Sequence, residues 1–267
     1  GLAGLAILGT LHLGLALTGL FFPALLLGAP VAGVLAGRWT RDRLPGAPRA
    51  PWWAWLGLAP LLPVALFLLV PDGVVDTYAY HLTVPQAFLR AHRGIFAEAP
   101  LPFQYPLLAE MGYAPAVALG LDALPHLLQF ACLAGALVLL GGWAARRGGP
   151  AAGWLAAVLA GSVGLAGRLV LVAKNDVVAA AYPLAAAACA LNVVAGGSRR
   201  WGIASAFLCG CGAATKLPGF VWLGLGAVAF VLARPRRGEA VRWAACAAVA
   251  PLPWLAKGFL VMGDPVW

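Results

Sequence analysis

Residues 124–145 read LPHLLQFACLAGALVLLGGWAA, without one charged side chain. A helix needs about 20 apolar residues to cross the hydrocarbon core of a bilayer, and this run is long enough. The whole chain of 267 residues has a similar character: 63% are hydrophobic, 10% are charged, and the mean hydropathy is +0.90. Soluble domains carry about a quarter charged residues. The composition therefore excludes a soluble enzyme and predicts an integral membrane protein.

Eight further apolar runs extend this prediction to an all-α, polytopic bundle of about eight or nine spans. They cover residues 2–17, 19–36, 52–70, 151–167, 177–195, 201–214, 217–233 and 240–260. The first two form an N-terminal hairpin within residues 1–37, with one long kinked helix as the alternative. We expect a single transmembrane domain with an outer loop at 71–123 and a helical bundle at 124–267. The chain begins with Gly1 and ends in a loop-like sequence, so we interpret it as a fragment.

The net charge of +9 is explained by orientation rather than by nucleic-acid binding. Lys and Arg collect in cytoplasmic loops because they are costly to translocate. Twelve of the 18 basic residues form four groups on one predicted side: Arg38, Arg41, Arg43 and Arg49; Arg146 and Arg147; Arg199 and Arg200; Arg234, Arg236, Arg237 and Arg242. The opposite side has seven of the nine acids: Asp72, Asp76, Glu98, Glu110, Asp122, Asp176 and Asp264.

Residues 107–121 are apolar enough to be helical but too short to cross a bilayer comfortably. The run contains Glu110, Tyr113 and Pro115. We therefore expect an amphipathic helix that lies flat at the outer interface. The outer segment 71–123 is then the longest stretch that does not span, and we expect functional residues there.

Asp76, Tyr80 and His81 are the first candidate site residues. A helix that begins near Asp76 places Asp76 and Tyr80 on one face. A carboxylate beside Tyr and His at the membrane boundary is suited to general base catalysis. The alternative is that Asp76 is a helix N-cap next to a solvated loop. His81 assists the base, binds a divalent metal together with Asp76, or is a hydrogen-bonded structural histidine.

Around these residues, the order of motifs resembles one family of membrane enzymes. The first outer loop of GT-C glycosyltransferases is similar to Asp76-x-x-x-Tyr80-His81-Leu82 followed by Pro85, Phe88-Leu89 and Gly94. This family includes the protein O-mannosyltransferases and the lipid A aminoarabinose transferase. Its later segments are similar, in order, to Phe103-Gln104-Tyr105-Pro106, Asp176, Gly210-x-Gly212-x-x-Thr215-Lys216-x-x-Gly219, Pro251-x-Pro253-Trp254, Lys257 and Gly263-Asp264-Pro265-Val266. The resemblance covers most of residues 52–267.

The resemblance implies an inverting transfer of a sugar from a polyprenyl-phosphate carrier to a lipid, glycan or protein acceptor. By its position in the motif, Asp76 takes the role of general base or acceptor-positioning carboxylate. The departing phosphate needs cations, for which Arg90, Arg93, Arg168, Lys174 and Lys216 are the outer-side candidates. The predicted substrate-binding residues are Tyr80, His81, Arg90, Gln104, Tyr105, Glu110, Arg168, Lys174, Asp176 and Lys216.

Several of these residues have structural alternatives. Lys216 near a hairpin tip meets an anion or extends its chain to the interface. Asp176, with Asn175 and Lys174, orients Asp76 or the sugar, or else caps the following span. Glu110 reaches the site or marks the wet face of its helix. If the site is shared, Asp76, Asp176 and Lys216 converge on one outer cavity.

Two further observations bear on substrate and location. The aminoarabinose transferase has Glu-Lys where this chain has Gln104-Tyr105, which argues against aminoarabinose as the sugar. Abundant Ala, Gly and Arg with little Lys indicates a GC-rich bacterial coding sequence, hence a bacterial plasma membrane with the site facing outward. The rival class is a transporter or flippase in which Asp76, Asp176 and Lys216 line the path. That class favours inverted repeats, and we find none.

Overall fold

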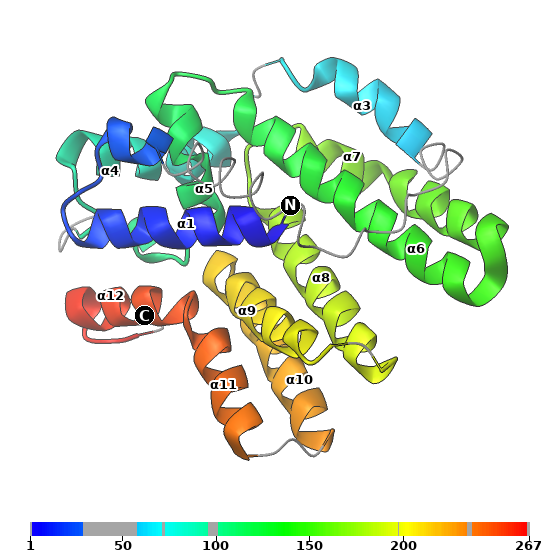
Figure 1. Cartoon of the computed structure of the whole chain (residues 1–267). Coiled ribbons are helices and arrows are strands. Elements are labelled where there is room, and N and C mark those ends of the chain that lie inside the picture. The colour runs from blue at the N-terminus through cyan, green and yellow to red at the C-terminus, as the bar shows by residue number, and fades with distance from the viewer. Residues whose placement is uncertain are drawn as a thin grey trace.

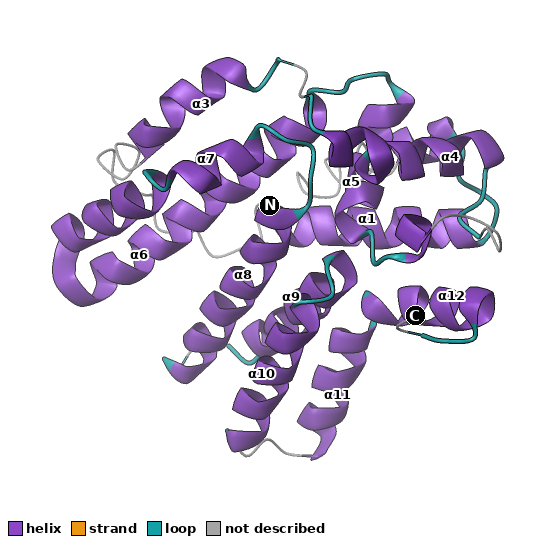
Figure 2. Ribbon diagram, turned by 180° about the vertical axis from the view of Figure 1, so that it is seen from behind, coloured by secondary structure: helices purple, strands orange, loops and turns teal. Residues whose placement is uncertain are grey.

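The computed structural model describes residues 2–28, 58–70, 73–95, 101–196, 198–233 and 237–265. Every regular element within these ranges is a helix, which confirms the predicted all-α class (Figures 1 and 2). Some predicted features lie outside the described residues. They are the end of the run 19–36 (residues 29–36), the start of the run 52–70, Asp72, Glu98, Arg38, Arg41, Arg43, Arg49, Arg234 and Arg236.

The helices form three groups in space (Figure 1). One group contains α1 (Leu2–Leu17), α4 (Thr83–Ala91) and α5 (Leu108–Ala118). A second contains α3 (Leu62–Phe67), α6 (Leu124–Gly161) and α7 (Gly164–Val170). The third contains α8 (Asp176–Val194), α9 (Arg200–Thr215), α10 (Gly219–Leu232) and α11 (Arg237–Ala248), and α12 (Pro251–Met262) returns toward α1. Two short turns, η2 (Thr77–His81) and η3 (Leu101–Gln104), belong to the first group.

The apolar run 124–145 forms the first arm of a helical hairpin. Helix α6 turns back at Gly149, whose φ of 78° lies in the left-handed region, and Pro150 begins the second arm (Figure 1). The arms touch at two other glycines, because a β-carbon on Gly153 would press against the carbonyl oxygen of Gly141. Both predicted runs, 124–145 and 151–167, are therefore present, and the second continues into α7 after a break.

Helix α9 is the centre of the third group, where it packs against α8, α10 and α11. Glycines allow these helices to approach closely. A β-carbon on Gly210 would overlap the carbonyl oxygen of Ala247 in α11, and one on Gly219 would overlap that of Gly212. The glycines of the 210–219 motif therefore permit close packing of α9 against its neighbours, as small residues do in membrane helices.

Three of the four basic groups lie at one end of this bundle. Arg146, near the turn of α6, donates a 3.4 Å hydrogen bond to Asn192 in the last turns of α8. Arg199, just before α9, pairs with Glu239 in the first turn of α11. Helix α8 begins at Asp176 and has 19 residues. Its two ends are thus about 28 Å apart at 1.5 Å per residue, close to the ~30 Å thickness of a bilayer core.

Within the described ranges, α6 and α8 are long and apolar enough to cross a membrane, and α11 with α12 makes a third span if the pair counts as one. Helices α11 and α12 meet at an angle of 58°, so the run predicted at 240–260 is broken. The break comes at Pro251, which lacks an N–H and therefore cannot continue the hydrogen bonding of α11. Membrane-crossing helices are therefore supported, but eight or nine spans are not.

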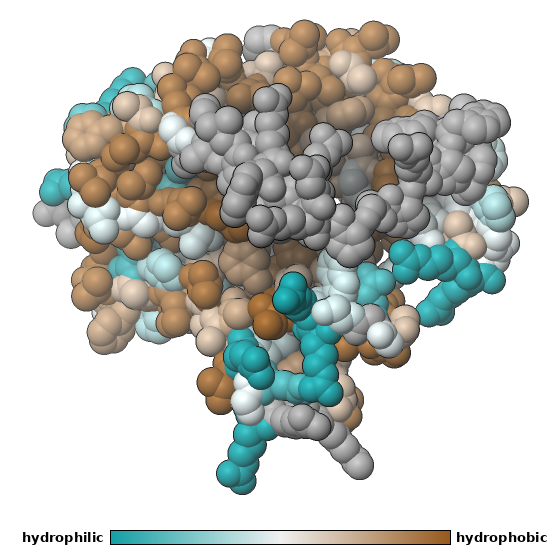
Figure 3. Space-filling model, viewed as in Figure 1, coloured by the Kyte–Doolittle hydropathy of each residue, from teal (hydrophilic) through white to brown (hydrophobic). Residues whose placement is uncertain are grey.

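Much of the visible surface is apolar, as expected for contact with lipid (Figure 3). On α10, for example, the side chains of Val221, Leu225, Val228 and Leu232 are all more than half exposed. In the same view, hydrophilic residues gather at the lower end, beyond α10 and α11. This surface is what a bilayer would cover, with polar residues at its edge.

The helix predicted at 107–121 is present, but residues 108–116 have no face open to water. These residues of α5 are all buried, and the helix packs against α1 and α4. Glu110 is fully buried, so the alternative that it marks a wet face is wrong. The prediction of an amphipathic helix is wrong because neighbouring elements enclose α5, and its polar side chains Glu110 and Tyr113 meet partners inside the protein. Helix α4 is the amphipathic element instead, with Phe88 buried and Arg90 exposed.

Candidate functional site

The site is built on the short connection between α7 and α8, which carries Lys174 and Asn175. Two buried side chains hold its backbone in place. The Tyr113 hydroxyl of α5 donates a 2.6 Å hydrogen bond to the carbonyl oxygen of Lys174, and the Gln129 amide of α6 donates to that of Val172. Polar side chains inside an apolar bundle need such partners. The connection is therefore a rigid platform, although it has no regular structure.

The side chain of Asn175 links this platform to α5 and α9. Its side-chain amide donates 3.0 Å to Oε1 of Glu110 in α5 and 3.1 Å to the carbonyl oxygen of Thr215, the last residue of α9. Glu110 Oε1 also lies 2.5 Å from Nδ1 of His81. Asn175, Glu110 and His81 are all buried. His81 thus has a structural hydrogen-bond partner, as one of the sequence alternatives proposed.

Asp76 and Tyr80 flank this network on a turn of π-helix, η2. The amide of Leu82 donates to the carbonyl oxygen of Thr77 at 3.0 Å, five residues back, instead of four. Such π-turns are rare and occur often at functional sites. Across the turn, the Tyr80 ring lies 4.0 Å from the ring of His81, centroid to centroid. The π-turn therefore places His81 in the buried network and leaves the adjacent Tyr80 half-buried.

Two lysine–aspartate pairs lie above the network. Lys174 Nζ is 2.5 Å from Oδ2 of Asp76, and Lys216 pairs with Asp176 at the start of α8. The hydrogen bond from Lys174 and its charge hold the pKa of Asp76 below its usual value, and the charges of His81 and Lys216 contribute further. Asp76 stands at the N-cap position of η2 but makes no side-chain capping hydrogen bond. The N-cap residue of α8 is Asn175, and Asp176 lies in the first turn instead.

An open cavity of about 230 Å³ adjoins the Lys216–Asp176 pair. Its lining residues come from η2, the segment before α5, the platform and the α9–α10 connection: Tyr80, Tyr105, Pro106, Leu107, Asn175, Thr215, Lys216, Leu217 and Pro218. The rings of Tyr80 and Tyr105 meet edge to face, with centroids 6.1 Å apart. Burial, together with the charges of Glu110 and Asp76, raises the pKa of Tyr80 to about 12, so its hydroxyl stays protonated.

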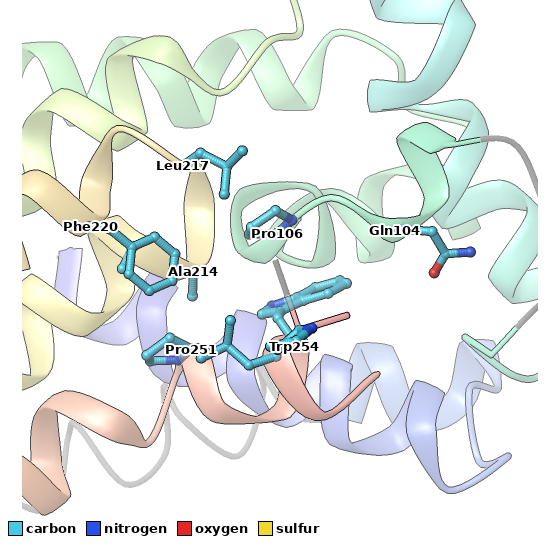
Figure 4. A pocket seen from close by; sticks show the side chains of 10 residues that line it. Gln104, Pro106, Ala214, Leu217, Phe220, Pro251 and Trp254 are labelled. Carbon is cyan, nitrogen blue, oxygen red and sulfur yellow. The ribbon is translucent and has the colours of Figure 1, made fainter. Parts of the chain in front are cut away.

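A smaller, apolar cavity of about 20 Å³ shares Pro106 and Leu217 with the first. Figure 4 shows Leu217, Ala214 and Phe220 on one side of it and Pro106 and Trp254 on the other. Its volume is enough for about one water molecule. The cavity lined by Lys216 thus adjoins a small apolar cavity between α9, α10 and α12, with which it shares two lining residues.

The structure brings together most of the predicted site residues. Lys216 lines the larger cavity, Asp176 pairs with Lys216, and Asp76 is joined to the platform by Lys174. The aspartates are not themselves lining residues. Asp176 is joined to the cavity by its contact with Lys216, and Asp76 contacts Lys174, the neighbour of the lining residue Asn175. Tyr80 and Tyr105 line the cavity, His81 and Glu110 lie beneath it, and Gln104 is buried beside the smaller cavity.

Three predicted cations are placed elsewhere. Arg90, Arg93 and Arg168 are exposed and do not line either cavity. The sequence offered no means to separate them from the lysines, because all five were assigned only to the outer side. Their predicted role in substrate binding stays a prediction.

Sequence reasoning missed three supporting residues, Tyr113, Gln129 and Lys257, in these roles. Lys257 of α12 is buried, donates to the carbonyl oxygen of Phe103, and lies 5.2 Å from the ring centroids of Phe88 and Trp254. Gln129 is the one amide in the apolar run 124–145. A polar group in such a run is costly unless it has a partner, and that signal was available from the sequence.

The metal alternative for Asp76 and His81 does not fit the arrangement. In the part of the chain that the structure describes, no three His, Cys, Asp or Glu side chains come together as metal ligands. His81 Nδ1 is engaged by Glu110, and Asp76 by Lys174. Among the described residues, His81 and Asp76 therefore have separate hydrogen-bond partners and do not form a metal site.

Comparison with known proteins gives no relative: no family model, no curated protein and no solved structure matches this chain.

Proposed function

We propose that this protein is a membrane glycosyltransferase of the GT-C type, which moves a sugar from a polyprenyl-phosphate carrier to an acceptor at the outer face of a bacterial plasma membrane. The observation that carries the proposal is the pair of lysine–aspartate contacts beside the 230 Å³ cavity. A displacement at an anomeric carbon needs a carboxylate at the acceptor and cations at the departing phosphate. Both kinds of group are present here.

The roles follow from the chemistry of an inverting displacement. The acceptor hydroxyl oxygen forms a bond to the anomeric carbon, its proton passes to a carboxylate oxygen of Asp76, and the bond from that carbon to the phosphate oxygen breaks. The electron pair of the broken bond stays on polyprenyl phosphate. Lys216, at the cavity lining, is placed to receive this negative charge.

The location of the cluster supports an outward-facing site. The platform lies at the start of α8, and the basic residues Arg146 and Arg199 lie near its far end, about one bilayer thickness away. Basic residues favour the cytoplasmic side, so the platform belongs at the opposite interface. We keep the arrangement of eight or nine spans as part of this proposal, because 29 consecutive residues (29–57) in the N-terminal region lie outside the described ranges.

The cavity favours a single sugar ring of neutral or anionic character. Its volume corresponds to about eight water molecules. Tyr80 and Tyr105 offer aromatic surfaces against which the apolar face of a sugar ring packs, and Lys216 is the one charged residue in the lining. A lysine disfavours a cationic amino sugar, in line with the Gln104-Tyr105 departure from the aminoarabinose transferase.

The deciding experiment is Asp76→Asn in the full-length protein, reconstituted in proteoliposomes. We would supply a radiolabelled polyprenyl-phosphate hexose or pentose and acceptor from membranes of cells that lack the protein. We expect sugar transfer and release of polyprenyl phosphate to fall by at least a hundredfold, the usual contribution of a general base. Asp122→Asn is the matched control, because Asp122 is an exposed acid in the α5–α6 connection.

Full turnover by Asp76→Asn at normal membrane insertion would refute the catalytic assignment. The same preparation tests the rival class. Movement of intact lipid-linked sugar across the bilayer, without release of polyprenyl phosphate, would identify a flippase instead.

A further inference from the structure

The Lys174–Asp76 pair poses a chemical problem for the proposed reaction. A general base must have a free oxygen and a substantial affinity for a proton. Here Oδ2 of Asp76 accepts a hydrogen bond from the ammonium of Lys174 at 2.5 Å, and this contact lowers the pKa of Asp76. The contact with Lys174 thus makes the Asp76 carboxylate a weaker base than an unpaired aspartate.

The second pair shows how a ligand changes this arrangement. Lys174, Lys216, Asp76 and Asp176 carry two positive and two negative charges, so the cluster is neutral as it stands. A phosphomonoester adds about −1.5 to −2 charges at neutral pH, and the phosphodiester of a polyprenyl-phosphate sugar adds one. Either group offers several acceptor oxygens to both ammonium groups at once, and these oxygens compete directly with the two carboxylates.

The geometry allows the lysine side chains to move while their backbone stays fixed. The carbonyl oxygen of Lys174 is held by Tyr113 at 2.6 Å, and Asn175 is anchored to Glu110 and Thr215. The pair itself is open to solvent, with 24% of the Lys174 side chain and 49% of the Asp76 side chain exposed. Exposed ion pairs are weak. Lys174 therefore swings on a rigid platform away from a contact that costs little to break.

We propose that Lys174 is a gate on Asp76: a phosphate monoester or diester that arrives at Lys216 draws Lys174 away, and this exchange frees the Asp76 carboxylate to accept the proton of the acceptor. Lys174 is in this sense a positioning residue. The inference rests on the proposed function, since it assigns the order of events within that site. It makes proton acceptance depend on a bound donor, which prevents an empty site from activating water or acceptor.

The remaining charges near Asp76 favour the same direction. Once Lys174 leaves, Asp76 faces the phosphate anion, and the cationic groups that act on it, His81 and Lys216, are shared with Glu110 and Asp176. Repulsion from the phosphate raises the proton affinity of the Asp76 carboxylate. Binding of the donor thus turns a weak base into a stronger one at the step that needs it.

The chain is well suited to a direct test, because it has only three lysines (Lys174, Lys216 and Lys257) and six aspartates. The full chain is labelled with ¹⁵Nζ-lysine and ¹³Cγ-aspartate, reconstituted in bilayers and examined by magic-angle-spinning NMR. Dipolar coupling between ¹⁵Nζ and ¹³Cγ reports the Lys174–Asp76 contact. Coupling between ¹⁵Nζ and ³¹P reports contact with phosphate. Lys174→Arg, Lys216→Arg and Asp76→Asn assign the signals.

We expect the Lys174–Asp76 coupling to be present without ligand and to be lost when a polyprenyl monophosphate is added to the bilayer, while ³¹P coupling to Lys174 and Lys216 appears. Lys257 is the internal control and should show no ³¹P coupling, because it is buried against Phe103. A second arm adds inorganic phosphate alone. If the Lys174–Asp76 coupling is lost with inorganic phosphate as well, phosphate itself is sufficient to open the gate. If the coupling is lost only with the lipid, the gate responds to the membrane-anchored ligand.

Two results separate the failure of the gate from the failure of the function. If ³¹P couples to Lys216 while Lys174 stays on Asp76, the gate is wrong and the glycosyltransferase proposal survives. If no lysine couples to ³¹P in either arm, while Asp76→Asn still abolishes sugar transfer, the gate is wrong and the phosphate lies elsewhere. Absence of ³¹P coupling together with full activity of Asp76→Asn overturns both.

Discussion

The buried amide of Asn175 provides the sharpest prediction about stability. In Asn175→Ala, the carbonyl oxygen of Thr215 loses its 3.1 Å hydrogen bond, and Glu110 Oε1 loses one of its two donors. A bond to a neutral carbonyl contributes about 0.5–1.5 kcal/mol, and one to a charged group about 1.5–3 kcal/mol. We therefore expect a loss of about 2–4 kcal/mol. Glu110 has little means to compensate, because its Oε2 has no hydrogen-bond partner among the described residues.

The assay is thermal unfolding in detergent, followed by the fluorescence of the 11 tryptophans. Asn192→Ala is the matched control, since it makes the same substitution near the other end of α8, where the amide has a 3.4 Å exposed contact with Arg146. That variant should change stability by less than about 0.5 kcal/mol. Asn175→Asp should be worse than Asn175→Ala, because it places a second carboxylate against buried Glu110.

Equal melting temperatures for Asn175→Ala and Asn192→Ala would refute the reasoning. So would an Asn175→Asp protein that is as stable as the natural chain. Either result would mean that α5, α8 and α9 are not joined through this amide.

Three further predictions concern the charge pair, the helix crossing and the cavity. Lys174→Met should raise the pKa of Asp76 toward 3.8, so the carboxylate protonates at a higher pH than in the natural chain; a ¹³Cγ titration measures this, and an unchanged titration curve would contradict the pairing. Gly210→Ala should destabilise the fold because a β-carbon there overlaps a main-chain carbonyl of α11. Gly224→Ala, with open space around it, should stabilise the fold by about 0.5–1 kcal/mol. A higher melting temperature for Gly210→Ala than for Gly224→Ala would contradict the close crossing of α9 and α11. Tyr105→Ala should raise the KM for the sugar donor roughly tenfold with a smaller change in kcat, and Tyr105→Phe should restore it, if the ring acts by packing; failure of Phe to restore it would assign the role to the hydroxyl.

The pH dependence of stability has a definite sign at the Asp76–Lys174 pair. The folded pKa of Asp76 lies below its unfolded value of 3.8. The contribution of the pair is therefore fully present above the unfolded pKa and is lost as the pH falls through the folded pKa. At neutral pH the pair is intact, so pH changes in the physiological range leave it unaffected.

Local sequence was sufficient where the structure depends on composition and turn chemistry. The apolar runs 124–145 and 151–167, with Arg146 and Arg147 between them, predicted both arms of α6, because helix formation and its interruption are decided within a few residues. The positions of Arg146 and Arg199 predicted the basic end of the bundle. By contrast, the prediction that the 107–121 helix is amphipathic was wrong. Its burial depends on α1 and α4, whose positions no local pattern contains.

The sequence by itself thus determined the all-α class, the membrane-like surface and the set of polar residues from which a site could be made. Only the tertiary structure decided how these residues pair. Lys174 and Asp76 are 98 positions apart, and Lys216 and Asp176 are 40 apart. Hydrophobic periodicity and turn residues act over a few positions, whereas the partner of a charged group depends on which helix ends meet in space. For that reason the candidate residues could be named from the sequence, but the gate could not.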